Sequence, residues 1–378
     1  MAELEVFFAT NRNLLEESPK LVFGEEFNAQ GPHVIRYGSA LVEASGSAAK
    51  RRYKLKRARL AEELIPKTGD EEPQRKLGSV EILDKLRERM DGEQMDSLCL
   101  IHGYASDFET ALLRGAELQD KWGAGRSLSV FVFSWPANGS TTPFLDYKSD
   151  RHDAQLSGIA IARAFLKLRG YLIDIGRERH CKQAIHLCAH SMGNWALRHA
   201  LQAIREELDD RLPRLLDHVF LMAADEDNDA FEHDGKLRLL PDLAKAVHVY
   251  FSEDDKALVV SDVTKRNPDR LGATGPRVRS SLPRKLDLVD CRLVDVVPPA
   301  QLSAEEIGRY LSQHQYYRLR PEVIADVRQV LDGVQPGEIE GRRFVQEDRS
   351  FLIEPAAKAK GKSKTRRKNL VGKTGPRK

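Results

Sequence analysis

The stretch that decides the fold reads Ala184-Ile185-His186-Leu187-Cys188-Ala189-His190-Ser191-Met192-Gly193. Residues 184–188 form a mostly apolar run typical of a buried strand, and a helical pattern continues from the serine to about residue 207. A serine at such a junction, with small residues two positions before and after it, is the pattern of a nucleophile elbow. Ala189 stands where glycine is usual, but it is small enough for a tight turn. We therefore predict that Ser191 is an exposed nucleophile; the alternative is that it only caps the helix.

The residues on either side of this stretch repeat the strand-then-helix order from about residue 96 onward. Such alternation is typical of a parallel sheet with helices on both faces, which is the α/β class. The expected strands are 98–101, 128–133, 184–188, 218–222, 247–251 and a sixth formed from 286–290 and 293–296. The expected helices are 107–121, 153–169, the one after Ser191, and a closing helix from Pro321 to Gly333.

The chain divides into four parts by pattern. Residues 1–95 are predicted to hold strands at 5–10 and 33–42, a polar loop at 66–75, a surface basic run at 50–57, and a helix at 79–91 that Gly92 ends; together they form an extension packed on the core. Residues 96–335 are the predicted core, 336–356 a C-terminal linker, and 357–378 a disordered basic tail.

Composition excludes several classes of protein. The 378 residues contain 60 Lys and Arg against 57 Asp and Glu, a net charge of +3, which argues against a uniformly basic nucleic-acid binder. No run approaches the roughly 20 apolar residues of a transmembrane helix, and no signal peptide is visible. The four cysteines form no Cys-x-x-Cys pair, which excludes a disulfide scaffold or a cysteine zinc ribbon. We expect a soluble, cytoplasmic protein.

The near-neutral total conceals the basic tail. Residues 357–378 contain ten Lys and Arg and no acidic residue. Such a segment could contact nucleic acid or anionic lipid through its charge, or it could be only a solubilising extension.

Acyl-transfer chemistry also needs hydrogen-bond donors that stabilise the oxyanion of the tetrahedral intermediate. His102-Gly103-Tyr104 follows the strand at 98–101, where the loop of such enzymes supplies one backbone N–H. The residue after the nucleophile supplies the other. We therefore assign the oxyanion hole to the backbone amides of Tyr104 and Met192, although His-Gly could also be a simple strand-ending turn.

A base and a carboxylate should follow the serine in the order Ser, Asp or Glu, His. His314 is the only one of the 11 histidines beyond residue 248, so it is the predicted base if the acid follows the strand at 247–251. Asp254 and Asp255 both lie in the loop after that strand. Asp225, after the preceding strand, is a third choice for the acid.

Two other stretches match known binding motifs only in part. Asp225-x-Asp227-x-Asp229 begins like a calcium loop, but its sixth position is Ala230 and its twelfth is Lys236. Gly372-Lys373-Thr374 ends like a phosphate loop without the earlier glycine or a preceding strand. The sequence implies neither a metal nor a nucleotide cofactor.

At these residues the chain resembles the α/β-hydrolase superfamily and, more narrowly, the bacterial DUF900 family of uncharacterised alpha/beta hydrolases. The matching blocks run in family order from residue 6 to about residue 333. They are Phe7-Phe8-Ala9-Thr10-Asn11-Arg12, Ile101-His102-Gly103-Tyr104, Phe133-Ser134-Trp135-Pro136, Tyr147-x-x-Asp150-Arg151, Ala189-His190-Ser191-Met192-Gly193-Asn194, Ala223-Ala224-Asp225, Tyr250-x-Ser252-x-x-Asp255-x-Ala257-Leu258 and His314-x-Tyr316-Tyr317. The resemblance implies the α/β-hydrolase fold and favours Asp255 as the acid over Asp254 and Asp225.

These observations predict a serine hydrolase with the triad Ser191, Asp255 and His314, acting on an ester, thioester or amide of a small-molecule acyl substrate. The blocks 134–136 and 150–151 are expected to border or brace the site. The alternative is a non-catalytic module of the same fold, which the basic tail recruits to nucleic acid or an anionic membrane.

Overall fold

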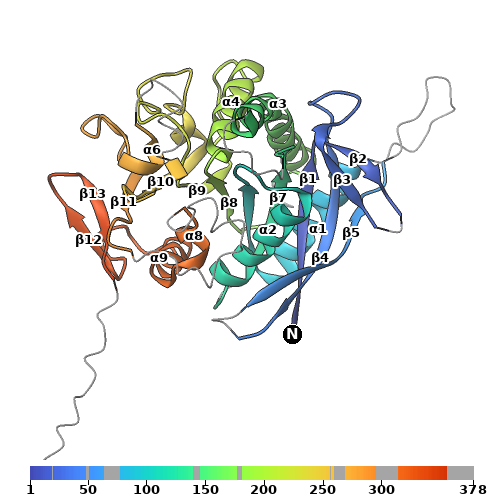
Figure 1. Ribbon diagram of the computed structural model, residues 1–378, viewed down its shortest axis with the longest axis horizontal. Helices are drawn as coiled ribbons and strands as arrows, with labels where there is room; N and C mark the ends of the chain where they lie inside the picture. Colours follow the sequence, from blue (N-terminus) through green and yellow to red (C-terminus); the bar gives the residue numbers. More distant parts are fainter. Residues whose placement is uncertain are drawn as a thin grey trace, which may run out of the picture.

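The computed structural model describes residues 1–18, 20–47, 51–63, 77–125, 127–138, 145–176, 181–255, 257–258, 269–294 and 314–355. The predicted loop at 66–75 and the tail at 357–378 lie outside the described residues. Within them, one 11-stranded sheet runs through the molecule in the order β12-β13-β11-β10-β9-β8-β6-β7-β1-β4-β5 (Figure 1).

The strands from β13 to β1 in this order run parallel. They are β1 (Ala2–Thr10), β6 (Asp96–Ile101), β7 (Leu128–Ser134), β8 (Ile185–His190), β9 (Leu216–Met222), β10 (Ala244–Phe251), β11 (Leu286–Asp290) and β13 (Ser350–Ile353). Helices cover both faces, so a central strand such as β7 is buried along its whole length. This explains why the central strands read as continuous apolar runs rather than as alternating ones. Because the strands are parallel, the loops that follow β6, β8, β9 and β10 meet at one edge.

The two ends of the sheet are antiparallel. β4 (Arg36–Ser45) pairs with β1, and β5 (Arg52–Leu60) pairs with β4 as the outermost strand. The basic run at 50–57 lies largely on β5, where exposed cations alternate with Tyr53 and Leu55, which pack on the core. β2 (Arg12–Glu16) and β3 (Val22–Phe27) form a separate hairpin.

The segment 336–356 differs from its prediction as a linker. It contains β12 (Arg342–Val345) and β13, which pair with each other, and β13 joins β11 through Val289 and Phe351. Both strands are only four residues long, too short for a period-2 pattern to show. The predicted strand at 293–296 also differs in its described part, because the chain turns at Leu293 with an N–H bond from Val294 to the Cys291 carbonyl; residues 295–296 lie outside the described residues.

The described helices divide between the two faces. One face carries α1 (Gly78–Glu93), α3 (Leu145–Asp174) and α4 (Gly193–Glu207), and the other carries α2 (Phe108–Trp122), α8 (Tyr316–Leu319) and α9 (Pro321–Leu331). Two short helical turns, η3 (Leu240–Leu243) and α6 (Leu271–Thr274), flank β10. Each face has its own apolar cluster, so the sheet lies between two buried layers.

The predicted glycine stop signal holds for α9 but not for α1. α9 begins at Pro321, and Gly333 beyond its end adopts φ +77°, as expected of a glycine stop. α1, in contrast, continues past Gly92. Gln94 takes the left-handed conformation at φ 53° and donates its N–H to the Met90 carbonyl, so glycine is not needed there.

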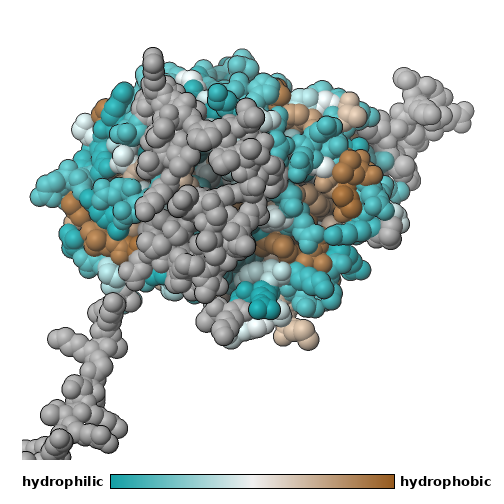
Figure 2. Space-filling view, viewed as in Figure 1, coloured by the Kyte–Doolittle hydropathy of each residue, from teal (hydrophilic) through white to brown (hydrophobic). Residues whose placement is uncertain are grey.

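The visible surface is largely polar. On the face drawn in Figure 2, hydrophilic residues predominate among the coloured ones, and apolar residues form small separate groups. The exposed large apolar residues, such as Leu15 and Ile173, come from different elements. Among the described helices, none combines the length and the apolar character that crossing a bilayer requires.

Three histidines lie next to one another across β8, β9 and β10. The ring of His186 stacks on that of His218 at 5.3 Å between centroids, and His218 Nδ1 lies 3.0 Å from His248 Nε2. Burial, and the neighbouring His248 and His186, lower the pKa of His218 to about 3. The folded protein therefore keeps His218 neutral where the unfolded chain, with an ordinary pKa of 6.5, takes up a proton.

From this difference we predict acid sensitivity. The stabilisation by neutral His218 is present above pH 6.5 and is lost as the pH falls toward about 3. His218→Gln should remove this part of the pH dependence. Between pH 7 and roughly 4.5, the unfolding free energy of the wild type should therefore fall by on the order of 2 kcal/mol more than that of the variant. Urea unfolding at both pH values measures this, and parallel curves for the two proteins would contradict the prediction.

Candidate active site

Ser191 sits in a strained turn between β8 and α4. β8 ends at His190 and α4 begins at Gly193, so only two residues make the turn. Ser191 has φ 51°, in the left-handed region that residues other than glycine rarely adopt. The Ser191 N–H donates to the Met222 carbonyl at 3.0 Å, and the Ser191 carbonyl accepts from the Asp225 N–H at 3.1 Å. The end of β9 thus holds the strained backbone in place.

Two glycines allow the backbone to pass close to this turn. A Cβ on Gly193 would lie 2.5 Å from the Ile101 carbonyl oxygen, and one on Gly103 would lie 2.8 Å from Ser191 Cβ. The sequence rule that the position two residues after the serine must be small therefore has a direct steric cause. The contact at Gly103 also places the loop after β6 against the elbow.

We predict that Gly193→Ala destabilises the protein by about 1–3 kcal/mol, because the atoms it would meet are backbone atoms that cannot move aside. Gly92 in α1 is the matched control, since nothing lies within 4 Å of its added Cβ. Gly92→Ala should stabilise slightly, by roughly 0.5–1 kcal/mol. Urea unfolding compares the two variants, and a Gly193→Ala protein as stable as the wild type would show that the turn has room.

A carboxylate and an imidazole meet at the same edge of the sheet. Asp255, in the loop after β10, places Oδ2 2.7 Å from Nδ1 of His314, and both side chains are buried. A carboxylate only accepts, so Nδ1 carries the proton and Nε2 is left with its lone pair. The other Asp255 oxygen accepts the Ala257 N–H at 3.2 Å. Of the three acids considered from the sequence, Asp254 is exposed and Asp225 has other partners.

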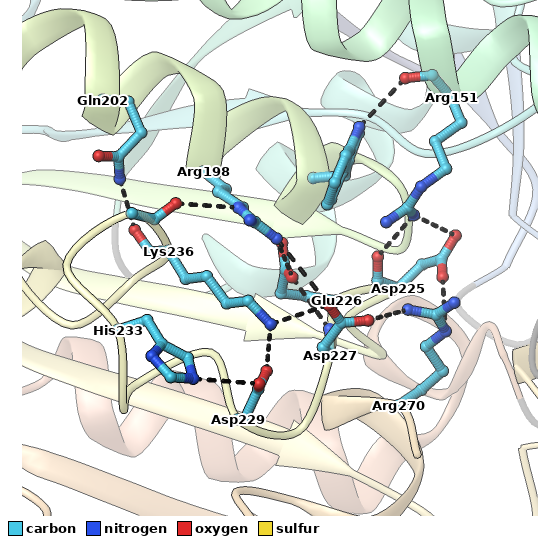
Figure 3. A network of polar contacts seen from close by, with 12 residues as sticks. Arg151, Arg198, Gln202, Asp225, Glu226, Asp227, Asp229, His233, Lys236 and Arg270 are labelled. Carbon is cyan, nitrogen blue, oxygen red and sulfur yellow. Dashed lines mark hydrogen bonds and ion pairs between the residues drawn. The ribbon is translucent and has the colours of Figure 1, made fainter. Parts of the chain in front are cut away.

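Asp225 belongs to a separate polar cluster (Figure 3). The Tyr147 hydroxyl donates to Asp225 Oδ2 at 2.6 Å. Arg151 and Arg270 lie within 3.8 and 3.4 Å of the same carboxylate. The Arg151 guanidinium stacks on Trp195 at 3.5 Å from the ring centroid. This cluster joins α3, α4 and the loop after β9 beside the elbow. Tyr147 and Arg151 of α3 therefore brace the loop after β9, and Arg151 belongs to the block 150–151 that is expected to border or brace the site.

The other aspartates of the loop after β9, Asp227 and Asp229, pair with basic side chains of the same chain. The Lys236 ammonium lies between the carboxylates of Asp227, at 3.0 Å, and Asp229, and Arg270 donates to Asp227 at 2.7 Å (Figure 3). Lys236 stands at the position where a calcium loop has its bidentate glutamate. Across the described residues, no group of three or more His, Cys, Asp or Glu side chains is arranged to hold a metal ion.

The segment that carries His314 is fastened to α2 and to the sheet. The Trp122 indole donates to the Tyr317 carbonyl at 3.0 Å, and Arg318 donates to Glu117 at 2.9 Å. The Tyr316 hydroxyl donates to a carbonyl of β10 at 2.9 Å. The block His314-x-Tyr316-Tyr317 thus anchors the imidazole. Sequence reasoning missed Glu117 and Trp122, because their partners lie nearly 200 residues away and no local pattern links them.

The loop after β6 is braced by His102 and Trp135. The Trp135 N–H donates to His102 Nε2 at 3.1 Å, while His102 Nδ1 donates to the Gly103 carbonyl at 2.9 Å. The indole N–H donates to the His102 carbonyl at 2.9 Å. Burial, together with the nearby charge of Arg12, lowers the pKa of His102 to about 3. His102 is therefore a neutral bracing residue.

Two buried ionisable residues, Arg12 and Asp150, also hold the loop after β6. Arg12 donates to the Ser106 carbonyl at 2.6 Å, and Asp150 accepts the N–H of Ala105, a residue with φ 52°. Burial raises the pKa of Asp150 to about 7. Arg12 comes from the N-terminal extension, so that extension helps to position Tyr104. Met192 is the N-cap residue of α4, where the first helical amides lack intrahelical partners.

The parallel sheet, the elbow at the end of β8 and the helices on both faces make this an α/β-hydrolase fold. The profile of the family described as "alpha/beta hydrolase of unknown function (DUF900)" matches residues 80–331, about two thirds of the chain. The chain belongs to this family. No curated protein matches it.

Proposed function

We propose that this protein is a serine hydrolase that cleaves an ester, thioester or amide bond of a small acyl compound. His314, oriented by Asp255, takes the proton from Ser191, whose oxygen attacks the substrate carbonyl. The amides of Tyr104 and Met192 stabilise the oxyanion. His314 passes the proton to the leaving group, and water, activated by the same imidazole, releases the acyl group.

The observation that carries this proposal is the buried hydrogen bond of 2.7 Å between His314 and Asp255 at the edge where Ser191 turns. β8 and β10 are separated only by β9, so the loops that follow them start about 10 Å apart. The His314 carbonyl lies 3.2 Å from the ring of His190, the residue next to Ser191. The strained elbow and the acid–imidazole pair are therefore neighbours.

A panel of chromogenic esters, thioesters and anilides of increasing acyl length tests the proposal. We expect saturable turnover of at least one of them, with the length dependence defining the acyl preference. Failure of the folded protein to turn over every compound in the panel would favour the non-catalytic binding module instead.

A further inference from the structure

His190, the residue directly before Ser191, contacts the segment that carries His314. Its Nε2 lies 3.2 Å from the His314 carbonyl oxygen, and the two rings are 4.8 Å apart at 52°. The His190 ring also stacks on Tyr317 at 4.4 Å and 27°. The residue is 7% exposed. One residue therefore joins the elbow to the main chain of the segment that carries His314.

The chemistry of this contact defines the tautomer and the charge of the His190 ring. A carbonyl oxygen only accepts, so Nε2 must carry the hydrogen. Burial lowers the pKa of His190 well below 6.5, and the neighbouring His314 ring, Arg114 and Arg318 act in the same direction, against the smaller opposing effect of the hydrogen bond to the His314 carbonyl. His190 therefore remains a neutral donor, and it adds no positive charge beside the imidazolium that forms on His314 during the reaction.

We propose that His190 is a positioning residue that holds the main chain of His314 through its Nε2–H while Asp255 holds the ring. The inference rests on the proposed function. Asp255 alone fixes one ring atom and leaves the ring free to pivot about that bond. The second hydrogen bond fixes the backbone from which the ring projects, and it does so from the residue bonded to Ser191. His190 then positions both the nucleophile, to which it is bonded, and the base, whose main chain it holds.

A pair of substitutions of similar size isolates this hydrogen bond. His190→Gln keeps an N–H donor at the same distance along the side chain, whereas His190→Met has similar bulk and no donor. We expect the Met variant to lose about 10- to 100-fold in kcat with KM within about twofold, and the Gln variant to recover most of that loss. His190→Phe, which keeps a ring against Tyr317 but no donor, replaces the Met variant if the latter does not fold.

His186 provides the matched control. It lies on β8 four residues earlier, on the same face of the strand, and is also buried. His186→Met should leave kcat unchanged. Equal kcat values for the Gln and Met variants of His190 would overturn the inference. Failure of the proposed function is distinguishable, because either the wild type would then turn over no compound of the panel or hydrolysis would persist in Ser191→Ala, whatever the residue at 190.

Discussion

Ser191→Ala is expected to lower kcat by about 10⁴- to 10⁶-fold while the protein remains folded. Removing the hydroxyl removes the covalent route, and what remains is the contribution of substrate binding and the oxyanion amides. The small side chain should not disturb the turn, since alanine is no larger than serine. Ser129, buried on β7 well away from the elbow, is the matched control, and Ser129→Ala should keep kcat within about threefold.

The same rate measurements should show that Ser191 and His314 act as one unit. His314→Ala is expected to cost about as much as Ser191→Ala, and the double variant should be little slower than either alone. Multiplicative losses, or a Ser191→Ala protein within tenfold of the wild type, would mean that the two residues do not share a reaction step.

Asp255→Asn is expected to lower kcat by about 10⁴-fold. An amide can donate a hydrogen bond to Nδ1, which would move the proton of His314 to Nε2 and leave no lone pair to accept from Ser191. The geometry would persist, so thermal unfolding should change far less than activity.

Asp254→Asn is the control for this substitution, because Asp254 is the exposed neighbour in the same loop. Its kcat should remain within a fewfold of the wild type. A large loss at Asp254 together with an active Asp255→Asn would reverse the assignment of the acid.

The central part of the fold could be predicted from the sequence because parallel strands with both faces covered must be apolar throughout. The runs before Ser191 and at 98–101 are of this kind, and they locate the elbow and the loop that we propose supplies an oxyanion donor. The order of the residues along the chain indicates His314 as the base. The choice between Asp254 and Asp255 came from family resemblance, and the 2.7 Å contact now distinguishes the two geometrically.

What the sequence could not predict depends on contacts between distant residues. The pairing of Glu117 with Arg318, and of Arg12 with the loop around Ser106, leaves no periodic signal. The strands β12 and β13 are too short for alternation to show. On β5, long charged side chains on the exposed face outnumber the apolar positions. The sequence therefore predicts a charged surface segment there, although the structure has an edge strand.

The central claim is that Ser191 is a nucleophile activated by His314. A fluorophosphonate probe tests it most directly, because stable labelling requires both a reactive serine and a neighbouring base. We expect one adduct per chain, mapped by peptide mass spectrometry to Ser191, absent in Ser191→Ala and strongly slowed in His314→Ala. A folded wild-type protein that takes up no label, or one labelled at another serine, would contradict it.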